Sequence, residues 1–312
     1  MIPRREFLAR TLGATLATAA LPLRGQADAT PAGACGGFHL RYGVTQSGNF
    51  DILENSETLA KMGFDYCEPA VVKTMSYSDA DFDAIRAKVA ATPCRVESMN
   101  SFIPGDMKVV GPSIDHAALD AYVQKSLARA NAFGTKIVVF GSGTARRIPE
   151  GFPREQAWRQ LQDFLRRVGD EIVRQNYGFV IGIEALRHQE SNIVNTTAEA
   201  YQLSVDTNHP KIKIICDFYH LATEHEDPTV LHKVKDRLVH LHFANECNAR
   251  AFPRDAAECP AYVPFFANLR AIGYDGRISI EASTHDFVND APLGLAALHK
   301  LYSDACLAQS LG

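Results

Sequence analysis

Hydrophobic and polar positions along this chain follow two alternating patterns. Short runs rich in β-branched and aromatic residues, such as "KIVVFGS" and "FVIGIEA", are typical of buried strands. Longer segments, such as "REQAWRQLQDFLRRVGDEIVRQN", repeat apolar residues every three or four positions, which is the period of an amphipathic helix. The pattern predicts strands at residues 38–44, 64–69, 94–100, 136–142, 179–185, 211–218, 238–244 and 277–283.

The predicted helices fill the intervals between these strands. They span residues 56–63, 79–92, 114–134, 154–176, 197–207, 227–235, 262–273 and 292–309. Gly63, Gly134, Gly178 and Gly273 fall just beyond four of these runs, where helices commonly end on a left-handed residue. Eight strands, each followed by a helix, predict an α/β fold of the (β/α)₈ or TIM barrel type.

A doubly wound open sheet is the alternative arrangement. That fold binds nucleotides through a glycine-rich turn after its first strand. Here "GVTQSGNF" has only isolated glycines, and "FGSGTARR" after the fourth strand lacks the further glycine of a dinucleotide fingerprint. Neither a low-complexity linker nor an internal repeat is detectable in the sequence. We therefore expect one barrel domain over residues 30–312.

The first 29 residues have the pattern of an export signal. Arg4 and Arg5 precede the apolar run "TLGATLATAALPL" and the small-residue site "ADA", which is typical of a twin-arginine (Tat) signal peptide. The run of about 13 residues is shorter than the roughly 20 that span a bilayer as a helix, so a stable membrane span is the weaker interpretation. We expect cleavage after Ala29 and a periplasmic protein delivered by the Tat export machinery.

Charge and cysteine content narrow the partners further. Removing residues 1–29 takes away four arginines and two acidic residues, so the formal charge moves from −4 to −6, and a nucleic-acid partner is not expected. Seven cysteines in an oxidising compartment leave at least one without an intramolecular partner. Cys247 and Cys259 are candidates for a local disulfide. The apolar runs around Cys67, Cys94 and Cys216 favour buried thiols.

Polar residues stand at the ends of the last four predicted strands. The four residues are Glu184, Asp217, His242 and Glu281. In a barrel the carboxyl ends of the strands meet on one rim, and three carboxylates gathered there repel one another unless a cation neutralises them. Oxygen-rich ligation with one imidazole suits a divalent metal ion. Mn²⁺ is the ion we expect first, with Mg²⁺, Co²⁺ and Zn²⁺ as alternatives.

Each residue alone has a simpler interpretation. A glutamate at a strand end is commonly solvated or paired, and Asp217 would suit the N-cap of the helix that follows it. His240 and His242 alternate along one strand and could merely pack on the same face. The occurrence of all four ligand types at successive strand ends favours the metal site.

These stretches resemble the xylose-isomerase-like sugar isomerases and epimerases, which include ketose 3-epimerases and hydroxypyruvate isomerases. The resemblance covers residues 40–301, and its most specific parts are "VVFGSGTARRIPEGF", "IEALRHQESNIVNT", "CDFYHL", "VHLHFANE" and "GYDGRISIEAS". It implies one divalent metal held by four ligands, namely Glu184, Asp217, His242 and Glu281. It also implies that Glu190 and His220 contact the substrate.

The sequence departs from the family pattern in two places. The family motif Glu-Pro-Leu-Asn-Arg is replaced by "EALRH", with Arg187 and His188 in place of Asn-Arg. The family's substrate-contacting arginine follows its histidine ligand by six residues, whereas Arg250 follows by eight. Arg250 is nevertheless our candidate for that contact, with a solvated loop arginine as the alternative. Glu68, at the end of the second strand, is a further candidate for lining the pocket, with a structural salt bridge as the alternative.

The expected function is a metal-dependent isomerase or epimerase of an unphosphorylated sugar or keto-sugar. Glu184 and Glu281 would exchange the proton next to a metal-chelated carbonyl, through an ene-diolate intermediate. Export argues against a phosphorylated metabolite as substrate. A keto-sugar lyase or hydratase on the same site is the first alternative. A phosphodiesterase resembling endonuclease IV and a non-catalytic periplasmic sugar binder are more distant ones. A homo-oligomer is left open.

Overall fold

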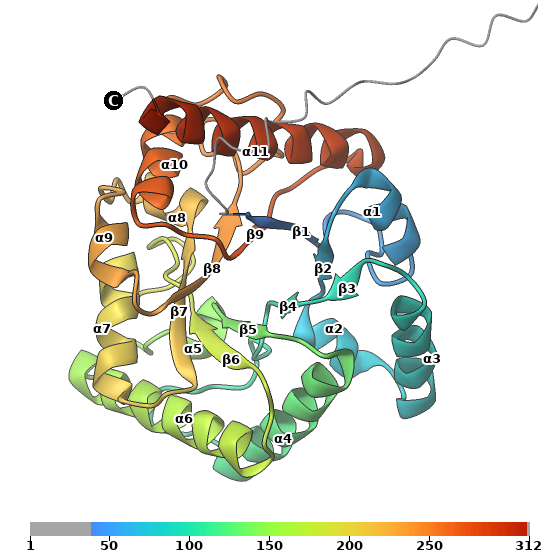
Figure 1. Cartoon of the computed structure of the whole chain (residues 1–312). Helices are drawn as coiled ribbons and strands as arrows, with labels where there is room; N and C mark the ends of the chain where they lie inside the picture. The colour runs from blue at the N-terminus through green and yellow to red at the C-terminus, as the bar shows by residue number, and fades with distance from the viewer. Residues whose placement is uncertain (1–38, 311–312) are drawn as a thin grey trace, which may run out of the picture.

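The structure, a computed structural model, describes residues 39–310 and places one parallel sheet inside a ring of helices (Figure 1). The strands are β1 (Arg41–Thr45), β2 (Tyr66–Glu68), β3 (Arg95–Val96), β4 (Ser98–Met99), β5 (Ile137–Phe140), β6 (Val180–Ile183), β7 (Ile212–Asp217), β8 (Leu238–Phe243) and β9 (Arg277–Ile280). Their order is β3-β2-β1-β9-β8-β7-β6-β5-β4, which forms a nearly closed barrel. The predicted fold class is confirmed.

Each of the eight predicted strand regions contains strand structure, and the third is divided. Glu97 separates β3 from β4, so the two pieces share the place of one barrel strand. Its carboxylate accepts hydrogen bonds from Arg41 and Arg277, at the starts of β1 and β9. Beyond the break, the Asn100 amide donates to the Pro69 carbonyl at 3.2 Å. This contact brings the end of β4 against the end of β2 and narrows the remaining gap.

The helices of the described chain alternate with these strands. They are α1 (Ser56–Met62), α2 (Val71–Ser76), α3 (Asp79–Ala90), α4 (His116–Phe133), α5 (Gly143–Arg146), α6 (Arg154–Arg174), α7 (Thr197–Thr207), α8 (Phe218–Thr223), α9 (Val230–Val234), α10 (Tyr262–Ala271) and α11 (Phe287–Ser310). The short helices α2, α5 and α8 were not predicted, because each has too few turns to show a helical period. All three follow strand ends, at the rim of the barrel.

The strands are buried as parallel strands covered by helices should be. All four residues of β5 are buried, as are the last three residues of β6 and of β9. Among the predicted helix-ending glycines, Gly63, Gly134 and Gly273 have positive φ angles of 99°, 80° and 68°, as expected. The prediction for Gly178 is wrong. Asn176, with φ 55°, takes the left-handed position after α6, because asparagine also tolerates that region.

The cysteine predictions agree with the structure where it describes them. Cys247 and Cys259 form a disulfide with a Cα–Cα distance of 5.7 Å. Cys67, Cys94 and Cys216 are free and buried. Within residues 39–310, no helix combines the length and apolar character needed to cross a membrane. The predicted signal peptide, residues 1–29, lies outside the described residues.

Candidate metal centre and active site

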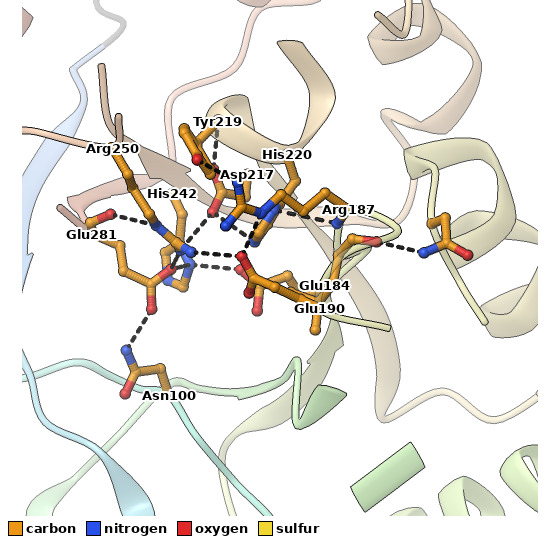
Figure 2. A network of polar contacts seen from close by, with 12 residues as sticks. Asn100, Glu184, Arg187, Glu190, Asp217, Tyr219, His220, His242, Arg250 and Glu281 are labelled. Carbon is orange, nitrogen blue, oxygen red and sulfur yellow. Dashed lines mark hydrogen bonds and ion pairs between the residues drawn. The ribbon is translucent and has the colours of Figure 1, made fainter. Parts of the chain in front are cut away.

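The structure brings the four predicted metal ligands together at the carboxyl-terminal rim. Glu184 and Glu281 directly follow β6 and β9, Asp217 ends β7, and His242 lies near the end of β8. Each offers one ligand atom, and these atoms all lie within 4.8 Å of one another (Figure 2). Four neighbouring parallel strands thus deliver one ligand each to a single point. Three of the side chains are buried, and that of Glu281 is 22% exposed.

The imidazole of His242 has one nitrogen directed at this cluster and one directed away from it. Its Nδ1 lies 2.9 Å from Glu184 Oε1 and 3.1 Å from Glu281 Oε2. Its Nε2 donates to Glu68 Oε1 at 2.8 Å. A hydrogen bond from the second ring nitrogen to a carboxylate is the usual support of a metal-binding histidine, because it fixes the tautomer and orients the ring. Nδ1 is therefore the nitrogen available for a metal.

Glu68 is placed differently from the pocket-lining position that we predicted. Its side chain is completely buried, and it also accepts hydrogen bonds from His240 Nε2 at 2.8 Å and from Ser279 Oγ at 2.5 Å. The Tyr66 hydroxyl is in turn hydrogen-bonded to the Ser279 hydroxyl at 2.9 Å. The alternative interpretation, a structural ion pair, describes this geometry. Glu68 lies beneath the ligands and reaches the rim only through His242.

The crowding of charges shifts the pKa values of the cluster in opposite directions. Burial, and then the Glu281 and Asp217 carboxylates, raise the pKa of Glu184. Burial also acts to raise the pKa of Glu281, but the nearby His242 and Arg250 outweigh it and hold that pKa well below its usual range. Burial acts to lower the pKa of His242, but three carboxylates, Glu281 first, raise it well above its ordinary value. The cluster therefore attracts positive charge.

A glycine makes room for one of the ligands. A Cβ built on Gly141, just after β5, would lie 2.2 Å from Glu184 Oε2. Real Cβ contacts essentially never reach this distance, so any side chain at position 141 would push the carboxylate out of its place. The glycine in "VVFGSG" is thus explained by the position of the Glu184 carboxylate rather than by a phosphate-binding turn.

Arg250 reaches the cluster despite its displacement in sequence. Its Nη2 lies 2.6 Å from Glu281 Oε2 and 3.3 Å from Asp217 Oδ2, and its Nη1 lies 3.5 Å from Glu190 Oε1. The guanidinium carbon also lies 5.0 Å from the centre of the Tyr219 ring. The guanidinium thus stands beside two of the four ligands and spans the distance to Glu190 (Figure 2).

Arg187 occupies the opposite side of Tyr219 and Glu190. It donates to Glu190 Oε1 at 2.7 Å and to the Tyr219 hydroxyl at 2.7 Å. The substitution of Arg187 for the asparagine of the family motif therefore adds a second arginine at the mouth of the site. The sequence does not identify Tyr219 as a site residue, because an aromatic residue two positions after Asp217 could equally belong to the hydrophobic core.

His220 and Asn100 complete the described surroundings. His220 is 2% exposed, and its Nε2 is buried without a hydrogen-bond partner, 3.5 Å from Asp217 Oδ2. Asn100 Nδ2 donates to Glu281 Oε1 at 2.9 Å. The sequence analysis missed Asn100, although it ends the predicted third strand in the same way as the ligands end theirs.

A cavity of about 430 Å³ opens over this constellation. It is lined by Glu184, Glu190, His220, Arg250, Glu281 and Asn100, among others. Residues from 101–105 and 141–145 supply another part of its wall, and among them Ser101 and Ser142 have positive φ angles. Carboxylates, an imidazole, an amide and a guanidinium around one cavity are the groups that bind and orient a polyhydroxylated molecule.

The four ligands fit a divalent cation. Three carboxylates and one supported imidazole meet at one point, and the unpartnered Nε2 of His220 lies beside them. Two other groups in the described residues are less suitable. His240 and Glu68 are already hydrogen-bonded to one another, and the sulfurs near Glu246 are joined in the Cys247–Cys259 disulfide, which leaves no thiolate.

Comparisons with known proteins agree on one family. A family model described as a xylose isomerase-like TIM barrel matches residues 57–303. The chain is 28% identical over 240 residues to 3-dehydro-D-guloside 4-epimerase of Escherichia coli (strain K12), which covers 74% of this chain and 87% of that protein. It is 27% identical over 173 residues to an inosose dehydratase of Lacticaseibacillus casei, which covers 49% of this chain and 56% of that protein.

Solved structures share the fold. The crystal structure of 3-keto-D-glucoside 4-epimerase from E. coli superposes with a TM-score of 0.69 at 24% identity, covering 84% of this chain and 99% of that one. An L-ribulose 3-epimerase gives a TM-score of 0.74 at 18% identity, covering 87% and 97%. Several proteins of similar architecture are thus sugar epimerases by name.

Proposed function

The chain belongs to the xylose isomerase-like TIM barrel family, and we propose that it is a divalent-metal-dependent epimerase or isomerase of an unphosphorylated sugar or keto-sugar. The observation that carries the proposal is the meeting of Glu184, Asp217, His242 and Glu281 within 4.8 Å at the floor of a polar cavity. Two of these residues are glutamates that line the cavity. They therefore combine metal ligation with access to a substrate.

The four ligands would hold one metal ion, and Mn²⁺ is our first expectation from the oxygen-rich donor set. Such an ion, when bound, polarises a carbonyl oxygen and thereby makes the neighbouring C–H bond more acidic. Glu68 contributes by holding the Nε2–H of His242 at 2.8 Å, which keeps Nδ1 directed at the ligand cluster.

Glu184 and Glu281 are the proton-transferring groups in this proposal. The carboxylate of one removes the proton from carbon, and the carboxyl group of the other returns a proton to the opposite face, which inverts the carbon. Return of the proton to the neighbouring carbon instead produces an isomer. Their environments differ, because the Arg250 guanidinium contacts Glu281 Oε2 at 2.6 Å, and this difference supports a division of labour between them.

The surrounding groups would orient the sugar. The unpartnered Nε2 of His220 would bond a substrate hydroxyl, and Glu190 and Arg250 would hold others. The 28% identity to a 3-dehydro-D-guloside 4-epimerase favours a keto-sugar within this class.

A keto-sugar dehydratase or lyase on the same site is the second candidate. The likeness to an inosose dehydratase favours it, although this chain spans only 56% of that relative. Both reactions begin with removal of a proton beside a carbonyl, and they differ in whether a hydroxyl group then leaves. The product therefore separates the two functions.

We also propose that residues 1–29 direct Tat-dependent export and that the mature chain, a single barrel domain, works in the periplasm. The twin arginines and the short apolar run in the sequence support this. An exported enzyme would meet unphosphorylated sugars.

Deuterium uptake from D₂O tests the chemistry. The Mn²⁺-loaded mature protein is incubated with a panel of ketoses, aldoses and keto-sugars, and products are identified by mass and NMR. We expect uptake at one carbon position, lost in Glu281→Gln and Glu184→Gln and kept in the exposed control Glu155→Gln. Absence of uptake from every compound would reject carbon-acid chemistry and favour the phosphodiesterase or sugar-binder interpretation.

A further inference from the structure

Arg250 is carried by a loop that folds back on itself, residues 245–259, which we call the arginine loop. The Arg250 amide donates to the Asn245 carbonyl at 2.9 Å, and the Asn245 amide donates to the Ala251 carbonyl at 2.9 Å. This reversal explains how an arginine eight residues after His242 reaches the cluster. The loop position, and not the sequence offset, delivers the guanidinium to Glu281.

The reversal requires strained backbone. Ala249 and Arg250 have φ angles of 46° and 65°, so two consecutive residues with side chains occupy the left-handed region. Such conformations persist only when the surrounding structure holds them in place. The fixed position of Arg250 therefore depends on whatever fastens the arginine loop at both sides.

On its inner side the loop is fastened to the barrel. The Ser283 amide donates to the Arg250 carbonyl at 2.8 Å, and the Arg250 guanidinium bonds Glu281 Oε2 at 2.6 Å. On its outer side the fastening is the Cys247–Cys259 disulfide, which ties the start of the loop to its end. Glu258 reinforces that side by accepting from Asn245 Nδ2 at 2.8 Å.

The disulfide is open to solvent on one side. Cys247 is exposed, whereas Cys259 is buried. Dithiols reach an exposed sulfur more readily than a buried one. The free thiols of the described chain, at Cys67, Cys94 and Cys216, are buried. The hydrogen bond with Cys94, and then burial, raise the pKa of Cys67, and burial raises the pKa of Cys216. They are therefore poor competitors in thiol exchange.

We propose that the Cys247–Cys259 disulfide is a redox-sensitive latch that holds Arg250 in the active site. An external dithiol reduces it with two electrons and two protons, which leaves two cysteine thiols and converts the dithiol to its own disulfide. The arginine loop then loses its outer fastening, the strained residues relax, and the guanidinium leaves Glu281 for part of the time. The latch itself rests on the loop geometry, and only its effect on substrate rests on the proposed function.

Chemical modification of arginine tests the latch without an assay of enzyme activity. Phenylglyoxal labelling of Arg250 is followed by mass spectrometry in the oxidised, dithiol-reduced and Cys247→Ser/Cys259→Ser proteins. Arg237 is the internal control, because its side chain is comparably exposed, at 22% against 21%, and lies outside the loop, just before β8. We expect labelling of Arg250 to rise about tenfold on opening the disulfide, with Arg237 unchanged.

The double variant also serves as the control for specificity. Because it lacks the disulfide, the dithiol must not alter its labelling, whatever other disulfides are reduced. Equal labelling of Arg250 in the oxidised and reduced proteins would overturn the latch. A rise at Arg237 as well would also overturn it, since that result indicates general unfolding.

The second arm uses the substrate found by deuterium uptake. We expect reduction to raise KM about five- to tenfold with a smaller change in kcat, because Arg250 orients the sugar while the glutamates transfer the proton. In an Arg250→Ala protein, reduction should leave KM unchanged. A KM effect that persists without Arg250 would contradict the latch. If the proposed function is wrong, only this KM experiment is lost, and the labelling experiment still tests the latch.

Discussion

Glu68 offers the sharpest test of how the site is supported. The substitution Glu68→Gln keeps the shape of the side chain and removes its charge. In the structure the carboxylate is fully buried and accepts three hydrogen bonds, from His240, His242 and Ser279. The amide that replaces it has one acceptor oxygen for these donors and directs its NH₂ group at one of them. Breaking a buried ion pair in this way typically costs about 3 kcal/mol of unfolding free energy.

The same change should weaken metal binding. Without the carboxylate at its Nε2, His242 loses both the orientation and the basicity that it supplies at Nδ1, so the Kd for Mn²⁺ should rise by about 10- to 100-fold. Free Mn²⁺ measured by EPR during a titration gives the Kd, and urea denaturation gives the unfolding free energy. Glu68→Gln should therefore change both quantities.

Glu226→Gln is the matched control for this experiment. Glu226 accepts the backbone amides of Thr197 and Ala198 at the start of α7, away from the ligands. Its loss should reduce stability by about 1 kcal/mol and leave the Mn²⁺ affinity unchanged. Unaltered Mn²⁺ affinity in Glu68→Gln, with stability also within 1 kcal/mol of the parent, would refute the supporting role of Glu68.

Three further predictions follow from the site and the barrel. Gly141→Ala should lower turnover by about 100-fold, because the added methyl group displaces the Glu184 carboxylate. The control Gly178→Ala has open space around it and should leave turnover unchanged. Equal rates of the two variants in a deuterium-uptake assay would contradict this prediction. Removal of metal with EDTA should abolish uptake, and Mn²⁺ should restore it, so full activity after exhaustive chelation would reject the metal site. Burial acts to raise the pKa of Glu97, but its two arginine partners outweigh it and lower that pKa below its ordinary 4.5. The ionised Glu97 therefore contributes about 1 kcal/mol to the free energy of unfolding above pH 4.5, and this contribution is lost as the pH falls through the folded pKa. Denaturation curves of Glu97→Gln and the parent should converge in acid, and a gap that widens there would contradict the assignment.

The four ligands could be located from the sequence because, in a parallel barrel, a residue's position at the end of a strand also determines its position at the rim. A polar residue that ends a buried strand is brought to the same rim as every other such residue. Glu184 and Glu281 were found in this way although 97 positions separate them in the printed sequence. The same reasoning applied to Asn100 would have succeeded, but asparagine at a strand end also reads as a turn residue.

Glu68 and Arg250 show where this reasoning stops. Glu68 ends its strand as the ligands do, but strands in a barrel are staggered, so equivalent sequence positions lie at different depths. It therefore lies below His242. The position of Arg250 depends on two left-handed residues and a disulfide, neither of which leaves a periodic pattern. Side chains placed by irregular loops cannot be derived from strand and helix spacing alone.

The pairing of β1 with β9 has a consequence for how the chain is made. Arg41 on β1 is in register with Arg277 on β9. The first strand of the described chain therefore gains its second neighbour only after the last strand has been made. A ribosome that has released only the first two hundred residues holds an open sheet with an exposed edge. The barrel can close only after β9 has emerged. Arrested chains ending before β9 should therefore be digested rapidly by proteases, while chains extended through α11 should resist.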